Sequence, residues 1–242
     1  IIAKQAGVLA GIGTAAEVFH RVDEGIVATK TLDDGALFSS GDEVMRMAGP
    51  TGSILTAERT VLNFLQRLSG IATQTRRYAD LLAGTGVQLL DTRKTTPGLR
   101  QLEKAAVLAG GGTNHRMGLH DMVMVKDNHL AGGLNAASLA DGVRKAKAAG
   151  LRVEVEADRL DQVRDFALVE GIDVILLDNM SLEEMREAVL LRPPGVQLEA
   201  SGGITLENIR AVAETGVNFI SVGALTHSAR ALDLSLEILG DE

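Results

Sequence analysis

Between residues 87 and 222, short apolar runs alternate with longer amphipathic stretches. Apolar runs without polar alternation are typical of strands buried on both faces, and the stretches between them have the periodicity of helices. This alternation predicts a parallel sheet covered by helices. The predicted strands are 87–90, 122–125, 151–155, 172–177, 196–198 and 217–222, and the predicted helices are about 98–109, 135–149, 159–170, 181–191 and 205–215.

The number of strands limits the kind of sheet. A short seventh strand at 116–119 fits the same repeat, although Gly118 disfavours it. Six or seven strands are too few for a complete eightfold barrel. The pattern therefore predicts an α/β fold with an open, seven-stranded α/β barrel.

The first 55 residues have a different pattern, in which short apolar segments are separated by turn signals at Asp34-Gly35 and Ser40-Gly41. They predict a β-rich, sandwich-type module. The pattern also resembles the hairpins of lipoyl or biotinyl carriers, but Lys30 is not placed at a hairpin tip, so we favour a structural module. We expect this module at 1–56, a linking helix at 57–86, and a barrel domain at 87–242 whose C-terminal segment can return to the module.

A helix is predicted from about residue 57 to 83, with Thr56 as its N-cap. Arg59 then falls in the first turn, where a cation opposes the helix dipole by a few tenths to about 1 kcal/mol. Two interpretations stay open: Arg59 is simply exposed, or it binds an anion together with the free N–H groups of that turn. The apolar positions that repeat at helical spacing are Val61, Leu62, Leu65, Leu68 and Ala72.

Composition narrows the class of protein. The chain has 242 residues, 45% of them hydrophobic and 2% aromatic, so its core consists of aliphatic side chains. Without cysteine it has no disulfide, zinc–thiolate site or thiol nucleophile, which suits a reducing, cytoplasmic location. A net charge of -8 and the lack of a basic stripe argue against nucleic acid as a partner, and no apolar run is long enough for a membrane span. Because the chain opens on Ile1, we expect a preceding segment in the natural protein.

Cations gather in the stretch from Asp91 to His129, which holds six of the 24 basic residues. Arg93 and Lys94 follow one apolar run, and Lys126 follows another. An unpaired buried cation costs several kcal/mol or more, so packing alone does not place a cation there. The simplest interpretation is an anion held at the mouth of a parallel β structure.

Later strands end in acids and then in glycine loops. Glu156 and Asp178 follow the third and fourth predicted strands. A single strand-end acid is more often a helix cap than a catalyst, but here each strand in turn ends in a charge or a glycine loop. Such a site suits an anionic substrate, a magnesium–phosphate group held through carboxylates, and a developing positive charge. The loops that resemble phosphate cradles are Ser201-Gly202-Gly203 and Ser221-Val222-Gly223.

The histidines do not indicate a transition-metal site. His115 and His120 are five positions apart, which matches no zinc signature. The triple glycine at 110–112 is interpreted as a loop that leads into His115 and Arg116.

Taken together, these segments resemble quinolinate phosphoribosyltransferases, the carboxylating nicotinate-nucleotide pyrophosphorylases of NAD synthesis. The resemblance covers nearly the whole chain, although members of this family usually begin some tens of residues earlier. The segments that carry it are AERTVLNFLQRLSGIAT (57–73), DTRKTTPGLR (91–100), GGTNHRMGLHDMVMVKDNH (111–129), VEVE (153–156), LLDN (176–179), EASGGI (199–204) and ISVGALTH (220–227).

The resemblance implies a fold, a reaction and a set of site residues. The fold is an open seven-stranded α/β barrel beside a sandwich, assembled as a homodimer or a hexamer of dimers. The reaction converts quinolinate and phosphoribosyl pyrophosphate to nicotinate mononucleotide, pyrophosphate and CO2 with Mg²⁺. Quinolinate would be bound by Thr92, Arg93, Lys94, His115 and Arg116, and by Arg59 of a neighbouring subunit. Lys126, Glu156 and Asp178 would be the catalytic residues on the phosphoribosyl side, and Glu156 and Asp178 would bind Mg²⁺ directly or through water or substrate. The 5′-phosphate would be bound by Ser201, Gly202, Gly203, Ser221, Val222 and Gly223.

Three alternatives remain. The first is a paralogous phosphoribosyltransferase for another anionic acceptor, of the type encoded with molybdate transporters. The second is a phosphate-binding barrel isomerase, which leaves the early cations without a role. The third is a metabolite sensor without activity, although the strand-end residues are intact. Arg93, Arg116 and Lys126 favour quinolinate.

Overall fold

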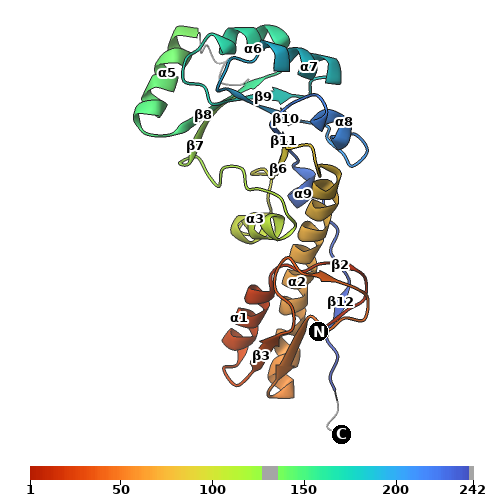
Figure 1. Cartoon of the computed structure of the whole chain (residues 1–242). Coiled ribbons are helices and arrows are strands. Elements are labelled where there is room, and N and C mark those ends of the chain that lie inside the picture. The colour runs from red at the N-terminus through yellow and green to blue at the C-terminus, as the bar shows by residue number, and fades with distance from the viewer. Residues whose placement is uncertain (127–135, 240–242) are drawn as a thin grey trace. The chain divides into compact units, whose positions relative to one another are not determined.

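The computed structural model of the chain describes residues 1–126 and 136–239, and these residues form two compact units. Unit 1 comprises Ile1–Ala79, Lys94–Thr113 and the segment from Gly223, and unit 2 comprises Asp80–Arg93 and Asn114–Val222 (Figure 1). The chain therefore leaves unit 1 and returns to it twice. Residues 127–129 of the motif quoted above, and residue 135 of a predicted helix, lie outside the described residues.

Unit 1 combines short strands with helices. Strand β3 pairs antiparallel with β5, β2 with β4, and β1 with β12. The glycines of both predicted turns, Gly35 and Gly41, have positive φ, which confirms these turns. The elements of unit 1 are β1 (Ile2–Ala3), β2 (Gly7–Val8), α1 (Ile12–Val22), β3 (Val27–Lys30), β4 (Leu37–Phe38), β5 (Met45–Ala48), most of α2 (Thr51–Leu81), α3 (Arg100–Ala109), α9 (Ala224–His227) and β12 (Leu234–Ser235).

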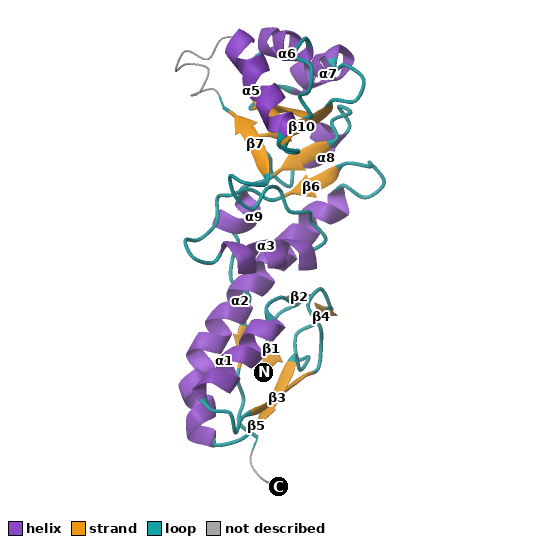
Figure 2. Cartoon of the chain, turned by 90° about the vertical axis from the view of Figure 1, so that its left-hand side faces the viewer, coloured by secondary structure: helices purple, strands orange, loops and turns teal. Residues whose placement is uncertain are grey.

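Helix α1 corrects the expectation that the first 55 residues contain only strands and turns. Ile12, Ala15 and Phe19 repeat at helical spacing and are buried, so they form one apolar face. The backbone N–H of Ile12 donates to the Asp34 carboxylate at 3.0 Å, which satisfies one donor at the start of the helix. Figures 1 and 2 both show α1 beside the first half of α2. Phe19, Met45 and Leu65 belong to the core that these elements share.

Helix α2 begins at Thr51, so the predicted start at Thr56 and residue 57 is wrong. Pro50 precedes the helix and its carbonyl accepts the Ile54 N–H at 3.1 Å; the fixed φ of proline suits a helix start. Thr56 lies within the helix and donates its hydroxyl to the Gly52 carbonyl at 2.8 Å. Arg59 is therefore beyond the first turn, and the argument that it opposes the helix dipole does not hold.

Unit 2 contains the parallel sheet. Its strand order is β6-β11-β10-β9-β8-β7, and every predicted strand from 87–90 to 217–222 is confirmed within a few residues. All pairings are parallel, and β6 and β7 are the edges among the described strands. The strands are β6 (Gln88–Leu90), β7 (Met122–Val125), β8 (Arg152–Ala157), β9 (Val174–Asp178), β10 (Gln197–Ser201) and β11 (Phe219–Ser221).

The predicted seventh strand at 116–119 is wrong. The segment forms bends, because the Asp121 carboxylate accepts the backbone N–H groups of Met117 and Gly118. A backbone whose donors are taken by a nearby side chain is not available to a strand ladder. The sheet in the described residues therefore has six strands instead of seven.

Helices cover the outer face of this sheet (Figure 1). The predicted helices are confirmed, but α8 is shorter than expected. The Asn208 side chain accepts the Thr205 N–H at 2.8 Å and donates to the Gly203 carbonyl at 2.9 Å, so 205–208 form a turn instead of helix. The helices of unit 2 are α5 (Ala136–Ala148), α6 (Leu160–Ala167), α7 (Leu182–Leu191) and α8 (Ile209–Ala213). Over the described residues, no helix has the length and apolar character that crossing a membrane requires.

Candidate active site

Strand register sets polar side chains on one face of the sheet in unit 2. Leu176 in β9 pairs with Glu156 in β8 and with Glu199 in β10. Since residues two apart in a strand point to the same side, Glu154 shares the face of Glu156. The polar or charged positions that the register puts on this inner face are Gln88, Lys126, Arg152, Glu154, Glu156, Asp178, Gln197, Glu199, Ser201 and Ser221.

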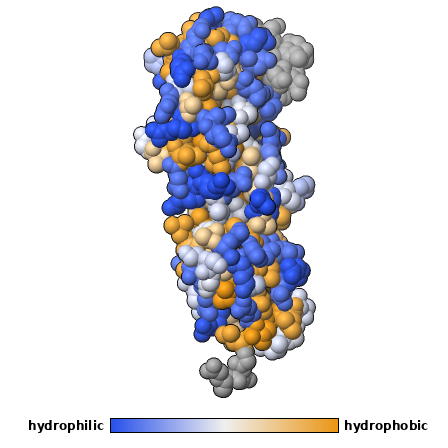
Figure 3. Space-filling view, turned by 90° about the vertical axis from the view of Figure 1, so that its right-hand side faces the viewer, coloured by the Kyte–Doolittle hydropathy of each residue, from blue (hydrophilic) through white to orange (hydrophobic). Residues whose placement is uncertain are grey.

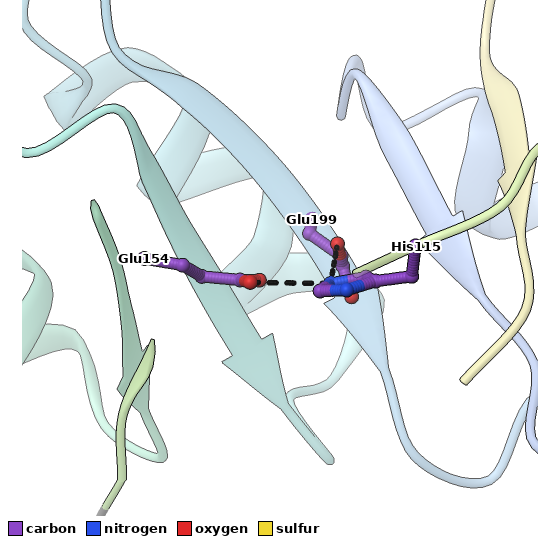
Figure 4. A group of neighbouring side chains, drawn as sticks. All are labelled: His115, Glu154 and Glu199. Carbon is purple, nitrogen blue, oxygen red and sulfur yellow. Dashed lines mark ion pairs between the residues drawn. The ribbon is translucent and has the colours of Figure 1, made fainter. Parts of the chain in front are cut away.

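Two glutamates of this face are fully buried around a histidine (Figure 4). Nε2 of His115 lies 3.1 Å from Oε2 of Glu154 and 3.3 Å from Oε2 of Glu199. The side chains of Glu154, Glu199 and His115 are 0%, 2% and 8% exposed. One Nε2–H group faces two acceptors and lies in line with at most one of them. Within the described part of the chain, both Glu154 oxygens and Oε1 of Glu199 lack a donor in hydrogen-bond geometry.

The other polar atoms of His115 connect it to its neighbours. Its backbone N–H donates to Oδ1 of the buried Asp91 at 2.8 Å. Its Nδ1 accepts the backbone N–H of Arg116 at 2.7 Å. Residue 115 is thereby attached to the end of β6, to the inner face of β8 and β10, and to the backbone of the next residue.

The carboxylates of Glu154 and Glu199 determine the direction in which the pKa of His115 is shifted. Burial lowers the pKa of His115, but the contacts with Glu154 and Glu199 outweigh it and raise the pKa to about 10. Burial and the charge of Glu199 raise the pKa of Glu154 to about 7. A pKa of about 10 would protonate both ring nitrogens of His115 at neutral pH. The Arg116 backbone N–H, however, points at Nδ1 at 2.7 Å, and a proton on Nδ1 would set two N–H groups against each other, so this geometry favours the neutral ring. A proton on Nε2 satisfies both the carboxylates and Arg116.

Arg116 lies over strand β7 next to another cation. Its guanidinium donates to the Met122 carbonyl at 3.2 Å and contacts Sδ of Met124 at 3.2 Å. Burial, and then the charge of Arg93, lower the pKa of Arg116, while the charge of Glu154 acts in the opposite direction. Two neighbouring guanidinium groups have the chemistry that suits an anion with more than one acidic group.

Lys126 and Glu156 form an ion pair at the ends of β7 and β8. Nζ of Lys126 lies 2.7 Å from Oε2 of Glu156. The lysine side chain is 45% exposed and the glutamate 11%, so the pair is open to a ligand on the lysine side. The structure thus brings together two of the predicted site residues.

Asp178 and the first glycine loop meet at the ends of β9 and β10. The Asn179 amide donates to Oδ2 of Asp178 at 2.8 Å, and the Asn179 backbone N–H donates to the Ser201 carbonyl at 2.9 Å. Gly202 and Gly203 have φ of 87° and 62°, which glycine adopts without strain. The predicted phosphate loop after Ser201 thus has a backbone conformation that favours glycine at both positions.

The remaining predicted residues divide between the two units. In unit 2, Thr92 is half-buried after β6, and Ser221 and Val222 are buried at the end of β11, where the Val222 N–H donates to Leu90 at 3.0 Å. In unit 1, the Lys94 carbonyl accepts the Thr226 hydroxyl at 2.8 Å. Gly223, also in unit 1, lies against the Lys94 side chain. Arg59 is exposed on α2 in unit 1.

His115, Glu154 and Glu199 also have ligand atoms within 4.8 Å of one another, as a metal site would require. A metal would bind the Nε2 lone pair and would thereby place the ring proton on Nδ1. The Arg116 N–H already points at that nitrogen. The cluster fits a proton on Nε2 better than a metal ion.

Glu154 and Glu199 were not predicted as site residues. Each lies inside an apolar strand, two positions before a predicted site residue, Glu156 and Ser201 respectively. A carboxylate in the interior of a buried strand is unfavourable without a partner, and that is the signal that identifies both positions. Asp91 carries the same signal directly after β6.

Comparison with known proteins assigns the family. The chain matches the quinolinate phosphoribosyl transferase N-terminal domain over residues 1–69 and the C-terminal domain of the same family over residues 71–237. It is 45% identical to the probable carboxylating nicotinate-nucleotide pyrophosphorylase of Bacillus subtilis, over 98% of this chain and 82% of that protein. It is 43% identical to the Mycobacterium leprae carboxylating nicotinate-nucleotide pyrophosphorylase, over 98% and 85% of the two chains.

Solved structures agree with this assignment. The nicotinate-nucleotide pyrophosphorylase of Francisella tularensis superposes with a TM-score of 0.89 at 41% identity, over 97% of this chain and 83% of that one. NadC from Streptococcus pyogenes superposes with a TM-score of 0.87 at 41% identity, over 96% and 82%. The α/β fold with an N-terminal domain and an open barrel is thereby confirmed. The chain belongs to the quinolinate phosphoribosyltransferase family.

Proposed function

We propose that the chain is a type II phosphoribosyltransferase that converts quinolinate and phosphoribosyl pyrophosphate to nicotinate mononucleotide, pyrophosphate and CO2 in de novo NAD biosynthesis. The observation that supports this most directly is the inner face of unit 2. Arg93 and Arg116 lie close enough to lower the pKa of Arg116, and the Lys126–Glu156 ion pair lies on the neighbouring strand ends. Family membership supports the same reaction.

The two carboxylates of quinolinate are assigned to the early cations. Arg93 and Arg116 are the described pair with the mutual repulsion that a dianion relieves. Thr92 precedes Arg93 in unit 2 and is proposed to bind quinolinate with it, and Lys94, the next residue in sequence, keeps the role that the family resemblance implies. Because guanidinium groups bind carboxylates in a bidentate manner, the pair selects a ligand with two acidic groups.

Phosphoribosyl pyrophosphate is assigned to the later strand ends. Glu156 and Asp178 lie on one face of adjacent strands, where their carboxylates suit the positive charge that develops at C1′. Lys126 is partly exposed and already bound to Glu156, so it suits the pyrophosphate oxygens. The proposed 5′-phosphate site consists of Ser201, Gly202, Gly203, Ser221, Val222 and Gly223.

Mg²⁺ is the proposed cofactor. The ion commonly binds proteins through one or two carboxylates together with substrate phosphates and water. Glu156 and Asp178 offer two carboxylates on one face of the sheet, which fits that pattern. When bound, Mg²⁺ would neutralise charge on the pyrophosphate group.

The chemistry requires positioning and electrostatic stabilisation and no nucleophile from the protein. The quinolinate nitrogen bonds to C1′ while the bond from C1′ to pyrophosphate breaks, and Glu156 and Asp178 stabilise the intervening oxocarbenium character. The ring nitrogen is then cationic. The bond between C2 and its carboxylate breaks, CO2 leaves, and the electron pair that remains on C2 takes up a proton.

We also propose a homodimer, or a hexamer of dimers, whose active sites are shared between subunits. Arg59 is exposed on α2, and Leu55, one turn earlier on the same helix face, is 50% exposed. Val27 of the same unit is 65% exposed, and apolar groups reach the surface of this unit in Figure 3. Exposed apolar groups beside an arginine are typical of a protein–protein interface.

Product analysis tests the reaction. With quinolinate, phosphoribosyl pyrophosphate and Mg²⁺, we expect nicotinate mononucleotide, pyrophosphate and CO2 in equal amounts. Nicotinate in place of quinolinate should be a very poor substrate, because a site for two carboxylates leaves cations unmatched when one is missing. Comparable turnover of the two acids would contradict the assignment and favour a paralogous transferase.

A further inference from the structure

Substrate binding alone does not explain the arrangement of His115, Glu154 and Glu199. Both ring nitrogens of His115 have protein neighbours: Nδ1 accepts the Arg116 N–H at 2.7 Å, and Nε2 faces the two carboxylates at 3.1 and 3.3 Å. The ring is 8% exposed. A histidine used in this way is suited to holding neighbouring residues more than to contacting a ligand.

The hydrogen bond to Nδ1 determines which ring nitrogen carries the proton. A nitrogen that accepts an N–H must present its lone pair, so the proton of the neutral ring lies on Nε2. There it points at Glu154 and Glu199, which come from β8 and β10. The carboxylates thus set the orientation of the ring, and the ring sets the position of the Arg116 backbone.

The buried glutamates do not have the geometry of a stabilising ion pair. Two carboxylates face a single N–H, and three of their four oxygens lack a donor in hydrogen-bond geometry within the described residues. Replacing a whole buried ionic cluster of this kind by well-packed apolar side chains is often neutral or stabilising for the fold, although removing one partner alone is destabilising. The two glutamates are therefore better explained by the orientation that they give the His115 ring than by a contribution to the stability of the fold.

We infer that Glu154 and Glu199 are positioning residues that act through His115 on Arg116. The charges of the two carboxylates orient the Nε2–H toward β8 and β10, with Nε2 at 3.1 and 3.3 Å from the two Oε2 atoms. Asp91 accepts the His115 backbone N–H, and Nδ1 accepts the Arg116 N–H, so that the Arg116 guanidinium is fixed above β7 before substrate arrives. This inference rests on the proposed function insofar as Arg116 binds a quinolinate carboxylate. Preorganisation of that kind strengthens binding because no side chain has to be ordered afterwards.

A double-mutant cycle tests the path through His115. Glu154→Leu is made in the wild-type and in the His115→Phe background, and binding of quinolinate and of phosphoribosyl pyrophosphate is measured by calorimetry. Loss of a negative charge near the arginines affects quinolinate binding in both backgrounds, whereas loss of the histidine contact acts only where His115 is present. We expect Glu154→Leu to weaken quinolinate binding roughly tenfold more in the wild-type background. Equal effects in the two backgrounds would overturn the inference.

Three controls accompany the cycle. Leu176→Met changes the packing of the same sheet face at the position that pairs with Glu199 and Glu156, and it should change quinolinate affinity less than about twofold. Glu154→Gln keeps a polar oxygen beside Nε2–H, although it removes the charge, and should retain more quinolinate affinity than Glu154→Leu. Phosphoribosyl pyrophosphate affinity should change little in every variant. Where His115→Phe does not fold, His115→Gln takes its place in the cycle.

Nitrogen NMR tests the geometry without any activity. Histidine labelled with ¹⁵N distinguishes the two ring nitrogens through their couplings to the ring protons, and the His115 signals are identified by their loss in the histidine variant. We expect Nε2 of His115 to carry a proton and Nδ1 to carry none at neutral pH, since Nδ1 accepts the Arg116 N–H. A proton on both nitrogens would overturn the inference. An unprotonated Nε2 would overturn the inference even in an active enzyme, whereas a protein without activity toward quinolinate but with a protonated Nε2 would contradict only the proposed function.

Discussion

Asn179 occupies the space where a side chain on residue 202 would have to lie. A Cβ added to Gly202 would be 2.2 Å from Oδ1 of Asn179, and the φ of Gly202 is 87°. Asn179 itself has a φ of 54°, the one positive value among the described residues other than glycine. The loop after β10 is thus fitted against the loop after β9, and each requires an uncommon backbone conformation.

Gly202→Ala is predicted to be more harmful than Gly203→Ala. Both glycines have positive φ, so both variants are strained by about 1 kcal/mol or more, but a Cβ on Gly203 meets open space. Gly202→Ala should lose at least roughly tenfold in affinity for phosphoribosyl pyrophosphate, measured by calorimetry, and a further 1–3 kcal/mol, roughly, in unfolding free energy.

The same collision predicts a rescue. Glycine suits the positive φ of residue 179, and Asn179→Gly removes the atom that the added Cβ at position 202 would meet. In that background Gly202→Ala should cost no more than Gly203→Ala. A full loss in both backgrounds would show that the collision is not the cause.

Substitutions of the acidic site residues are predicted to impair catalysis, and substitutions of the cationic ones to impair quinolinate binding. Glu156→Gln and Asp178→Asn should lower kcat roughly 100-fold or more while quinolinate affinity changes little, because these carboxylates stabilise charge that exists only in the transition state. Arg116→Ala should weaken quinolinate binding directly, by roughly 2–4 kcal/mol. Calorimetric titration of the three variants with quinolinate distinguishes them; equal losses of affinity contradict this division.

Subunit complementation tests the shared site. Arg59→Ala and Lys126→Ala should each be nearly inactive as pure assemblies. After co-refolding, a mixed dimer has one site that lacks both side chains and one that has both, so about a quarter of wild-type activity should return if pairing is random. A size tag on one variant confirms subunit exchange. Complete exchange without recovery means that each subunit uses its own Arg59.

Lowering the pH should reduce the contribution of Asp173 to the free energy of unfolding. Its carboxylate accepts the Val153 N–H at 2.7 Å and binds Nζ of Lys147 at 2.8 Å. Burial raises the pKa of Asp173, but the contacts with Lys147 and Val153 outweigh it, so the pKa in the folded state is below its ordinary value. A lowered pKa stabilises the fold above the unfolded-state pKa of about 3.9, and this stabilisation is lost as the pH falls through the folded-state value.

Asp173→Asn should therefore lower the unfolding free energy by about 1 kcal/mol at pH 7, after allowance for solvent screening, and by progressively less below about pH 4. Urea unfolding at a series of pH values measures the difference. Asp158→Asn is the control, since the Asp158–Arg159 pair is half exposed and should contribute little. A pH-independent difference for Asp173→Asn would contradict the argument.

The parallel sheet could be predicted because its signal is local. Each strand of this sheet contains a short apolar run, interrupted by a glutamate in β8 and in β10, and each helix between strands repeats at helical spacing. The segment at 116–119 failed because its backbone donors bind Asp121, a contact that hydrophobic pattern does not reveal. Helix α1 was missed because its apolar face is short and lies among turn residues.

Those residues of the candidate site that carry a charge and lie at the end of a strand could be predicted from the sequence. Lys126 and Glu156 contact each other as strand-end residues should. Helix α2 begins directly after Pro50 and not at Thr56. Arg59 therefore lies beyond the first turn, although the sequence pattern placed it within that turn. Glu154 and Glu199 could not be assigned as site residues from their spacing in the sequence. They lie in β8 and β10, and His115 lies in a loop, so only the register of the folded sheet brings the three side chains together.

Unit 1 cannot be completed early in synthesis. Strand β1 pairs with β12, and Lys4 forms an ion pair with Glu237, 233 positions later. The strands of the parallel sheet, β6 to β11, all leave the ribosome before β12 is made. The sheet of unit 2 can therefore form while β1 still lacks its partner, and during that interval β1 offers an open edge to other nascent chains and to chaperones.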